Sequence, residues 1–246
     1  MGINAEAAQY ARDLWGQDIV ILDTETTGLG DDAEIVEISI LDKKGNSLLD
    51  TLVKPKKSIP AAATKIHGIN NKDVADAPTW EQVYPQFRDV IKNKVVVIYN
   101  SQYDNKIIKQ VCAMSGVPNP RRKSECAMLL YSDYINIINP KTGNTKWHKL
   151  TDAVAQCGIP ASNAHRAKGD CEMTLNILKH MACVYDGEKI EPVNNTVSDG
   201  VRKLKTPRKY NDKKHSEIMF VIGLVFMTLT AIIKMAYSVL KVIFKK

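Results

Sequence analysis

A short, unbroken run of apolar, mostly β-branched residues, KVVVIYN at 94–100, constrains the fold more than any other segment of this chain. A strand without polar alternation is suited to burial on both faces, as in sheets that helices cover on both sides. A second apolar run, DIVILDTE at 18–25, ends in acids. Residues 34–55 form two alternating stretches joined by Lys44-Gly45-Asn46, which predicts a β-hairpin.

Four segments are predicted to be helical. A short polar helix at 4–15 precedes the strands, apolar residues recur at helical spacing in 79–92, and 105–114 and 168–184 form two further helices. Strands that first pair as a hairpin and then alternate with helices predict an α/β domain with a mixed sheet. We therefore expect a polar helix or extension at 1–16 and one globular domain at 17–186.

The net positive charge of the chain comes entirely from its last quarter. Residues 1–186 hold 22 basic and 22 acidic residues, whereas 187–246 hold 12 basic and 5 acidic ones, which accounts for the whole net charge of +7. A basic domain is a frequent sign of nucleic-acid binding. Because the globular part is neutral, a nucleic-acid substrate has to be inferred from its site instead.

Acidic side chains follow the ends of two of the predicted strands. Asp23 and Glu25 end the first strand, and at a spacing of two residues they point to the same side. Asp104 lies just beyond the strand at 94–100. Neighbouring carboxylates repel one another unless a cation lies between them, and such oxygen ligands suit Mg²⁺ or Mn²⁺.

A polar loop, His165-Arg-Ala-Lys-Gly-Asp170, is the third candidate element. It predicts a loop that runs into a helix beginning near Asp170, so that the aspartate is fixed while His165 can reach over a metal site. Histidine exchanges protons near neutral pH, as a general base must. Taken alone, each acidic element is better explained by an exposed turn or by an acid at a helix start.

The combination is more specific than its parts. The chain contains four motifs in this order: ILDTETTGL (21–29), IHGI (66–69), YNSQYD (99–104) and HRAKGD (165–170). Their order and spacing resemble the DnaQ-like DEDD exonuclease family, and a histidine five residues before the last aspartate marks its DEDDh branch. The resemblance covers residues 17–185 and implies an RNase H-like fold, a five-stranded mixed sheet flanked by helices. Tyr99 and Cys171 depart from frequent family residues, at positions that are not ligands in the motif.

The resemblance also implies a function for each motif residue. The family's metal ligands fall on Asp23, Glu25, Asp104 and Asp170, and its general base falls on His165. The implied cofactors are two divalent cations, Mg²⁺ or Mn²⁺, and the implied reaction releases nucleoside 5′-monophosphates from a free 3′ end. Closer likeness to proofreading-type members favours DNA over RNA. The alternatives are an RNA-trimming exoribonuclease of the same superfamily and a non-catalytic, membrane-anchored nucleic-acid-binding protein.

Substrate contacts are implied at four further residues. Thr27 and Leu29 line the terminal-nucleotide pocket by resemblance, and His67 approaches it. Arg166 is placed to meet phosphates. Three of them have an equally good structural interpretation: core packing for Leu29, a turn residue before Gly68 for His67, and a solvated loop for Arg166. Nothing in the sequence identifies a polymerase or replication partner.

The end of the sequence predicts a membrane contact. Residues 187–217 form a basic, flexible linker, and 218–246 form a hydrophobic helix that spans or lies on a membrane. The uncharged run 218–233 covers about 24 Å as a helix, short of a bilayer's roughly 30 Å. Extension to Leu240 includes Lys234, whose ammonium can reach the headgroups. The competing interpretation is a core helix docked on the domain.

The expected location is the cytoplasmic face of a membrane. Seven basic residues stand before the apolar run and favour retention of the nuclease on the cytoplasmic side: Arg202, Lys203, Lys205, Arg208, Lys209, Lys213 and Lys214. The same residues can bind anionic lipid or a DNA backbone, and their position beside the apolar run favours lipid. The five cysteines lack metal-site spacing, which predicts reduced thiols. If the tail is not a membrane segment, the protein is expected to be cytoplasmic.

Overall fold

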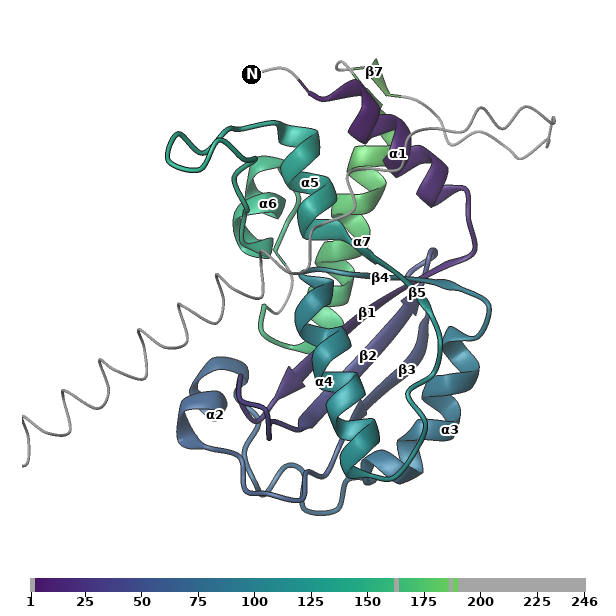
Figure 1. Cartoon of the computed structure of the whole chain (residues 1–246), viewed down its shortest axis with the longest axis vertical. Helices are drawn as coiled ribbons and strands as arrows, with labels where there is room; N and C mark the ends of the chain where they lie inside the picture. Colours follow the sequence, from purple (N-terminus) through teal and green to yellow (C-terminus); the bar gives the residue numbers. More distant parts are fainter. Residues whose placement is uncertain (1–2, 162–163, 186–187, 190–246) are drawn as a thin grey trace, which may run out of the picture. The chain divides into compact units, whose positions relative to one another are not determined.

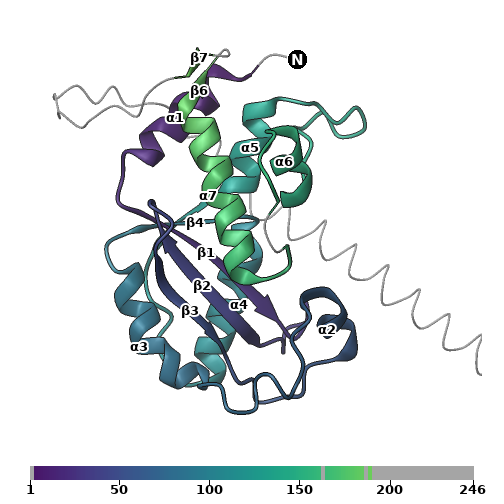
Figure 2. The same ribbon diagram turned by 180° about the vertical axis from the view of Figure 1, so that it is seen from behind.

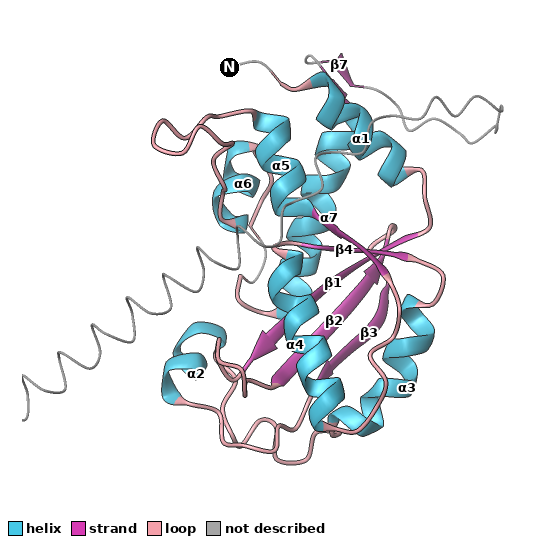
Figure 3. Cartoon of the chain, in the orientation of Figure 1, coloured by secondary structure: helices cyan, strands magenta, loops and turns pink. Residues whose placement is uncertain are grey.

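The computed structural model describes residues 3–161, 164–185 and 188–189, and its centre is a mixed sheet (Figures 1 and 3). The strands are β1 (Ile19–Thr26), β2 (Ile35–Asp42), β3 (Ser47–Leu52), β4 (Val95–Ile98) and β5 (Lys123–Cys126). They lie in the order β3-β2-β1-β4-β5. The pairs β1–β4 and β4–β5 are parallel, whereas β2 runs antiparallel to both β1 and β3. The five-stranded mixed sheet is therefore confirmed.

Helices cover both faces of this sheet, as Figure 2 shows from behind. They are α1 (Ala5–Trp15), α2 (Ala61–His67), α3 (Trp80–Ile91), α4 (Ser101–Met114), α5 (Ala127–Ile135), α6 (Leu150–Gln156) and α7 (Ala167–Cys183). A short pair, β6 (Val184–Tyr185) and β7 (Glu188–Lys189), follows α7. Alternation along β1 sends Ile19 and Ile21 into the core with α1, α5 and α7, and Val20 and Leu22 into the core with α3 and α4.

The strands and the hairpin form where the sequence pattern placed them. All four residues of β4 are buried, as its unbroken apolar run requires. The turn between β2 and β3 is held by Asp42, whose Oδ1 accepts the backbone N–H groups of Lys44 (2.8 Å) and Asn46 (2.9 Å). Gly45 occupies the left-handed region of this turn, with φ of 84°, which a residue without a Cβ adopts at little cost.

One predicted boundary is wrong. The helix expected at 105–114 begins at Ser101. Asn100 adopts the left-handed conformation, with φ of 65° and ψ of 52°, and turns the chain directly from β4 into α4. Asp104 therefore lies inside the first turn of the helix, and not in a loop before it.

The C-terminal segments lie largely outside the described residues. Among the helices that the structure describes, none has both the length and the hydropathy that a membrane crossing requires. Within the predicted linker at 187–217, Glu188–Lys189 is described as β7. The predicted hydrophobic helix at 218–246 falls entirely outside the described part of the chain.

Candidate active site

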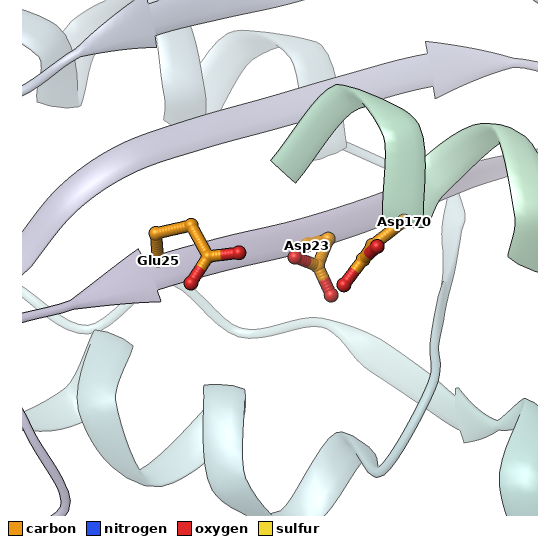
Figure 4. A group of neighbouring side chains, drawn as sticks. All are labelled: Asp23, Glu25 and Asp170. Carbon is orange, nitrogen blue, oxygen red and sulfur yellow. The ribbon is translucent and has the colours of Figure 1, made fainter. Parts of the chain in front are cut away.

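Three carboxylates meet at the end of β1. Asp23 and Glu25 project from one face of that strand, and Asp170 reaches them from the first turn of α7 (Figure 4). Each offers one ligand oxygen, and these three oxygens all lie within 4.8 Å of one another. The spacing of two residues along a strand and the packing of α7 over the same face together create the group.

Burial, and repulsion from neighbouring acids, raise the pKa values of these carboxyl groups. Burial, and then the charges of Asp104 and Asp170, raise the pKa of Asp23 well above its usual range. Burial, and then Asp170 and Glu37, raise the pKa of Glu25 to about 8. A divalent cation would favour the ionised forms, and an all-carboxylate donor set suits a hard ion such as Mg²⁺ or Mn²⁺. The residues present therefore fit a metal.

Asp104 adjoins this group from a different element. Its side chain is 3% exposed, and its Oδ1 accepts a 2.7 Å hydrogen bond from Thr24 Oγ1. Burial raises the pKa of Asp104 to about 7. Asp104 is not one of the three acids whose oxygens lie within 4.8 Å of one another. Its charge nevertheless raises the pKa of Asp23, so Asp104 is electrostatically coupled to the three-carboxylate group.

His165 lies beside Asp170 at the start of α7. Its backbone N–H donates to Asp170 Oδ1 at 3.2 Å, and its side chain is exposed. The residue has φ of 64°, in the left-handed region that few residues other than glycine occupy. Burial raises the pKa of Asp170, and the backbone N–H and charge of His165 oppose that shift. The backbone of His165 is thus fixed beside Asp170, while its side chain is exposed to solvent.

The loop after β1 presents one of the predicted substrate residues and ties down another. The side chain of Leu29 is 79% exposed. Thr27 is buried, and its Oγ1 accepts the backbone N–H of Glu34 at 2.9 Å. Leu29 is therefore free to contact a ligand, whereas the hydroxyl of Thr27 holds the loop.

The other two predicted substrate residues have partners within the protein. His67 Nδ1 accepts the N–H of Ile69 (3.0 Å), so the ring hydrogen is on Nε2, which donates to the Thr26 carbonyl (3.2 Å). Burial lowers the pKa of His67, in keeping with this neutral form. The guanidinium of Arg166 lies on the carboxylate of Glu37. Both residues thereby fix the segments that surround the carboxylates.

Two residues near the site were not singled out from the sequence. Glu37 is a charge in the middle of a largely apolar strand, and that contrast was its available signal. Tyr103 is part of the YNSQYD motif. Its hydroxyl lies 2.6 Å from Thr26 Oγ1 and donates to the Gly28 carbonyl at 2.8 Å. It thus joins α4 to the loop after β1.

Comparison with known proteins identifies the family. The family model for exonucleases of the RNase T type matches residues 20–178. The chain belongs to this exonuclease family. It is 44% identical to the uncharacterized exonuclease CP81 of Escherichia phage 186 over 186 residues, which are 73% of this chain and 95% of that one. It is 25% identical to DNA polymerase III subunit epsilon of Treponema pallidum, over 74% of this chain and 84% of the relative.

Solved structures agree with this membership. Exonuclease X in complex with 5′-overhanging duplex DNA matches with a TM-score of 0.51 and 26% identity, over 66% of this chain and 90% of that one. The nuclease domain of 3′hExo, a DEDDh family member bound to rAMP, shares the fold with a TM-score of 0.53 and 19% identity, over 65% and 90%. The chain is a 3′→5′ exonuclease of the DEDDh type, and its cofactors are two divalent cations.

Proposed function

We propose that this exonuclease shortens single-stranded DNA from free 3′ ends and releases nucleoside 5′-monophosphates. The observation that carries the proposal is the group formed by Asp23, Glu25 and Asp170, whose oxygens lie within 4.8 Å of one another beside Asp104. DNA is favoured because the related protein from Treponema pallidum is named a DNA polymerase III subunit and Exonuclease X was solved with DNA.

Each of the five motif residues has a role in this proposal. Asp23, Glu25, Asp104 and Asp170 would hold the two divalent cations. When bound, such ions neutralise phosphodiester charge and make water a better nucleophile at neutral pH. A ring nitrogen of His165 takes the proton that the attacking water loses. The exposed position of this imidazole, next to Asp170, lets it pass that proton on to solvent.

The terminal nucleotide is placed by the loop after β1. Leu29 is exposed there, and an apolar side chain can pack against the face of a base. Thr27 and His67 act indirectly, because their polar atoms hold the loop and the end of α2 in place. We therefore expect Leu29→Ala to weaken substrate binding more than it slows the chemical step.

A competition assay tests the substrate class and the residue roles together. Single-stranded DNA and RNA of the same sequence, labelled at the 5′ end, are mixed with the full-length chain in Mg²⁺, Mn²⁺ or EDTA. We expect stepwise shortening of the DNA in either metal and none in EDTA. Preferential shortening of RNA would replace DNA with RNA as the substrate. Asp23→Ala and His165→Ala should each abolish cleavage while the protein still binds DNA, and unchanged rates would refute the assigned roles.

The proposal includes a membrane anchor on the C-terminal side of the nuclease domain. It is supported by the uncharged run at 218–233 and by the basic residues before it, which favour a nuclease on the cytoplasmic face. Deletion of residues 217–246 should move the protein from the membrane fraction to the soluble fraction. Val225→Asp is a matched test, since it keeps the length and puts one charge in the middle of the run. Full-length protein that is soluble after gentle lysis would refute the anchor.

A further inference from the structure

A fifth acid faces the same side of the sheet as the carboxylate group. Glu37 on β2 is the cross-strand partner of Glu25 on β1, and residues directly opposite in an antiparallel pair project to the same face. The Glu37 side chain is only 6% exposed. Like charges in opposite positions destabilise a sheet, so a buried glutamate at this place needs a compensating partner.

That partner is the first residues of α7. Arg166 Nε lies 3.1 Å from each carboxylate oxygen of Glu37, and Arg166 Nη2 donates to Oε1. The backbone N–H of Ala167 donates to Oε2 at 2.9 Å. Both oxygens of Glu37 are thus occupied by protein donors, in the fork geometry that makes arginine–carboxylate pairs strong and directional. Glu37 is therefore unlike the neighbouring acids, whose oxygens face one another.

In the sequence, the residues that contact Glu37 lie between His165 and Asp170. Arg166 and Ala167 follow His165 directly, and the backbone N–H of Asp170 donates to the Arg166 carbonyl at 3.0 Å. His165 in turn donates its N–H to Asp170 Oδ1, from a left-handed backbone that the surroundings must hold in place. A group that fixes Arg166 and Ala167 to β2 therefore fixes both the imidazole and the fourth carboxylate relative to β1.

We propose that Glu37 is a positioning residue for catalysis, which acts through Arg166 and the Ala167 amide to hold His165 and Asp170 against β1. The inference rests on the proposed function, in which His165 takes a proton and Asp170 is a metal ligand. It assigns Arg166 to a contact within the protein and not to a substrate phosphate. Loss of the contact lets the start of α7 move, and small displacements of catalytic groups cost up to about 10²-fold in rate.

The test separates positioning from substrate binding by steady-state kinetics. Glu37→Gln keeps the size of the side chain and loses its charge, and Arg166→Ala removes the partner, which is half-exposed and tolerant of truncation. For both variants we expect kcat to fall about tenfold to 10²-fold with KM within a few-fold of wild type. The double variant should be no slower than the worse single variant, because the two residues act as one unit.

A neighbouring ion pair supplies the matched control. Lys168 lies two residues after Arg166 and contacts Asp50 on β3 at 3.7 Å, with both side chains more exposed than Glu37. Lys168→Ala removes a positive charge from the same turn without touching the Glu37 contact. It should leave kcat unchanged, since exposed pairs of this kind hold little energy. Hydrogen exchange of the peptide covering 164–170 should accelerate in Glu37→Gln and not in Lys168→Ala.

Each outcome decides the matter. A raised KM with unchanged kcat in Arg166→Ala would make Arg166 a phosphate contact and overturn the inference, as would wild-type kcat in Glu37→Gln. If Glu37→Gln does not fold, Arg166→Ala still tests the contact from its exposed side. Asp23→Ala and His165→Ala are measured in parallel. Activity that survives in those two variants refutes the proposed function itself, whereas their loss beside fully active Glu37 and Arg166 variants refutes only the positioning.

Discussion

Two groups of largely buried acids lie at one end of the sheet. Only one of the groups has its carboxylate oxygens paired with donors from the protein. In the first group, Asp23, Glu25 and Asp170 face one another. Burial raises all three of their pKa values, and the charges of neighbouring acids, Glu37 among them, raise them further. In the second group, which we call the paired carboxylates, Glu34 and Glu37 are more fully buried than the acids of the first group. Their oxygens accept hydrogen bonds from backbone N–H groups and from a guanidinium.

The difference separates scaffold from site. The oxygens of Glu34 accept the N–H groups of Lys56 (2.8 Å) and Lys57 (2.9 Å), so this acid fixes the loop that follows β3. A buried charge whose hydrogen-bonding capacity is filled by the protein needs nothing more. Acids that are buried beside other acids are destabilised in their ionised form, and a bound cation removes this destabilisation. Burial of an acid alone therefore does not indicate a metal site.

The largest expected effect is loss of cleavage in Asp23→Asn. Removal of one ligand from a metal-assisted phosphodiester hydrolysis costs several kcal/mol of transition-state stabilisation, or at least about 10³-fold in rate. Single-turnover cleavage of 5′-labelled, single-stranded DNA measures it. Asp89→Asn, which alters an exposed acid on α3, is the control and should cleave normally. Wild-type rates in Asp23→Asn would remove the distinction between the two groups of acids.

The second effect is a pH-dependent instability of the metal-free protein. The folded state holds the proton of Glu25 up to pH about 8, whereas the usual value is 4.5. The folded state therefore binds more protons between these values, and the free energy of unfolding falls as pH rises through that window. A shift of this size corresponds to roughly 5 kcal/mol.

Denaturant unfolding in EDTA at about pH 5.5 and about pH 8.5 measures this loss. Glu25→Gln should show a much smaller difference between the two pH values, because the amide does not titrate. Added Mg²⁺ or Mn²⁺ should restore stability to the wild type at the higher pH by binding the folded state. Identical pH dependence in wild type and Glu25→Gln would show that ionisation of Glu25 does not destabilise the folded protein.

Local patterns in the sequence were sufficient for four of the five strands and for half of the site. Apolar runs and alternation located β1, the β2–β3 hairpin and β4, and the spacing of two between Asp23 and Glu25 put them on one face. These features depend on residues that are near one another in the chain. Strand β5 was missed, because its sequence, KSEC, is polar and gains its place by pairing at the edge of the sheet with β4.

Contacts between distant segments were beyond local patterns. Glu37 and Arg166 are 129 residues apart, and Thr24 and Asp104 are 80 apart. The resemblance to a family brought Asp104 and Asp170 to the site by their motifs, but it said nothing of Glu37. The early start of α4 depends on the left-handed backbone of Asn100. Asparagine tolerates this conformation, but its presence in a sequence does not show that the conformation is adopted.

The paired carboxylates supply the third effect, which is on stability. Glu34→Ala leaves the N–H groups of Lys56 and Lys57 without their acceptor, at a cost of about 1–3 kcal/mol in the free energy of unfolding. Metal-dependent cleavage should persist under conditions where the variant is folded. Chemical denaturation and the cleavage assay together measure both quantities. Complete loss of cleavage in a folded Glu34→Ala protein would make Glu34 part of the active site, and the separation of the paired carboxylates from the metal-site acids would be wrong.

The smallest effect belongs to Tyr103, which joins α4 to the loop after β1. Tyr103→Phe removes a hydroxyl that contacts Thr26 and Gly28 in the loop after β1, and it should lower the free energy of unfolding by about 0.5–1.5 kcal/mol. Tyr131→Phe is the matched control, since its hydroxyl bonds Gln156 away from this loop. Because Tyr103 orders the loop that carries Leu29, its loss should raise KM by a few-fold and leave kcat nearly unchanged, whereas Tyr131→Phe should alter neither. If kcat falls in Tyr103→Phe as steeply as in Asp23→Asn, the hydroxyl takes part in the chemistry, and the boundary of the site includes the first turn of α4 beyond Asp104.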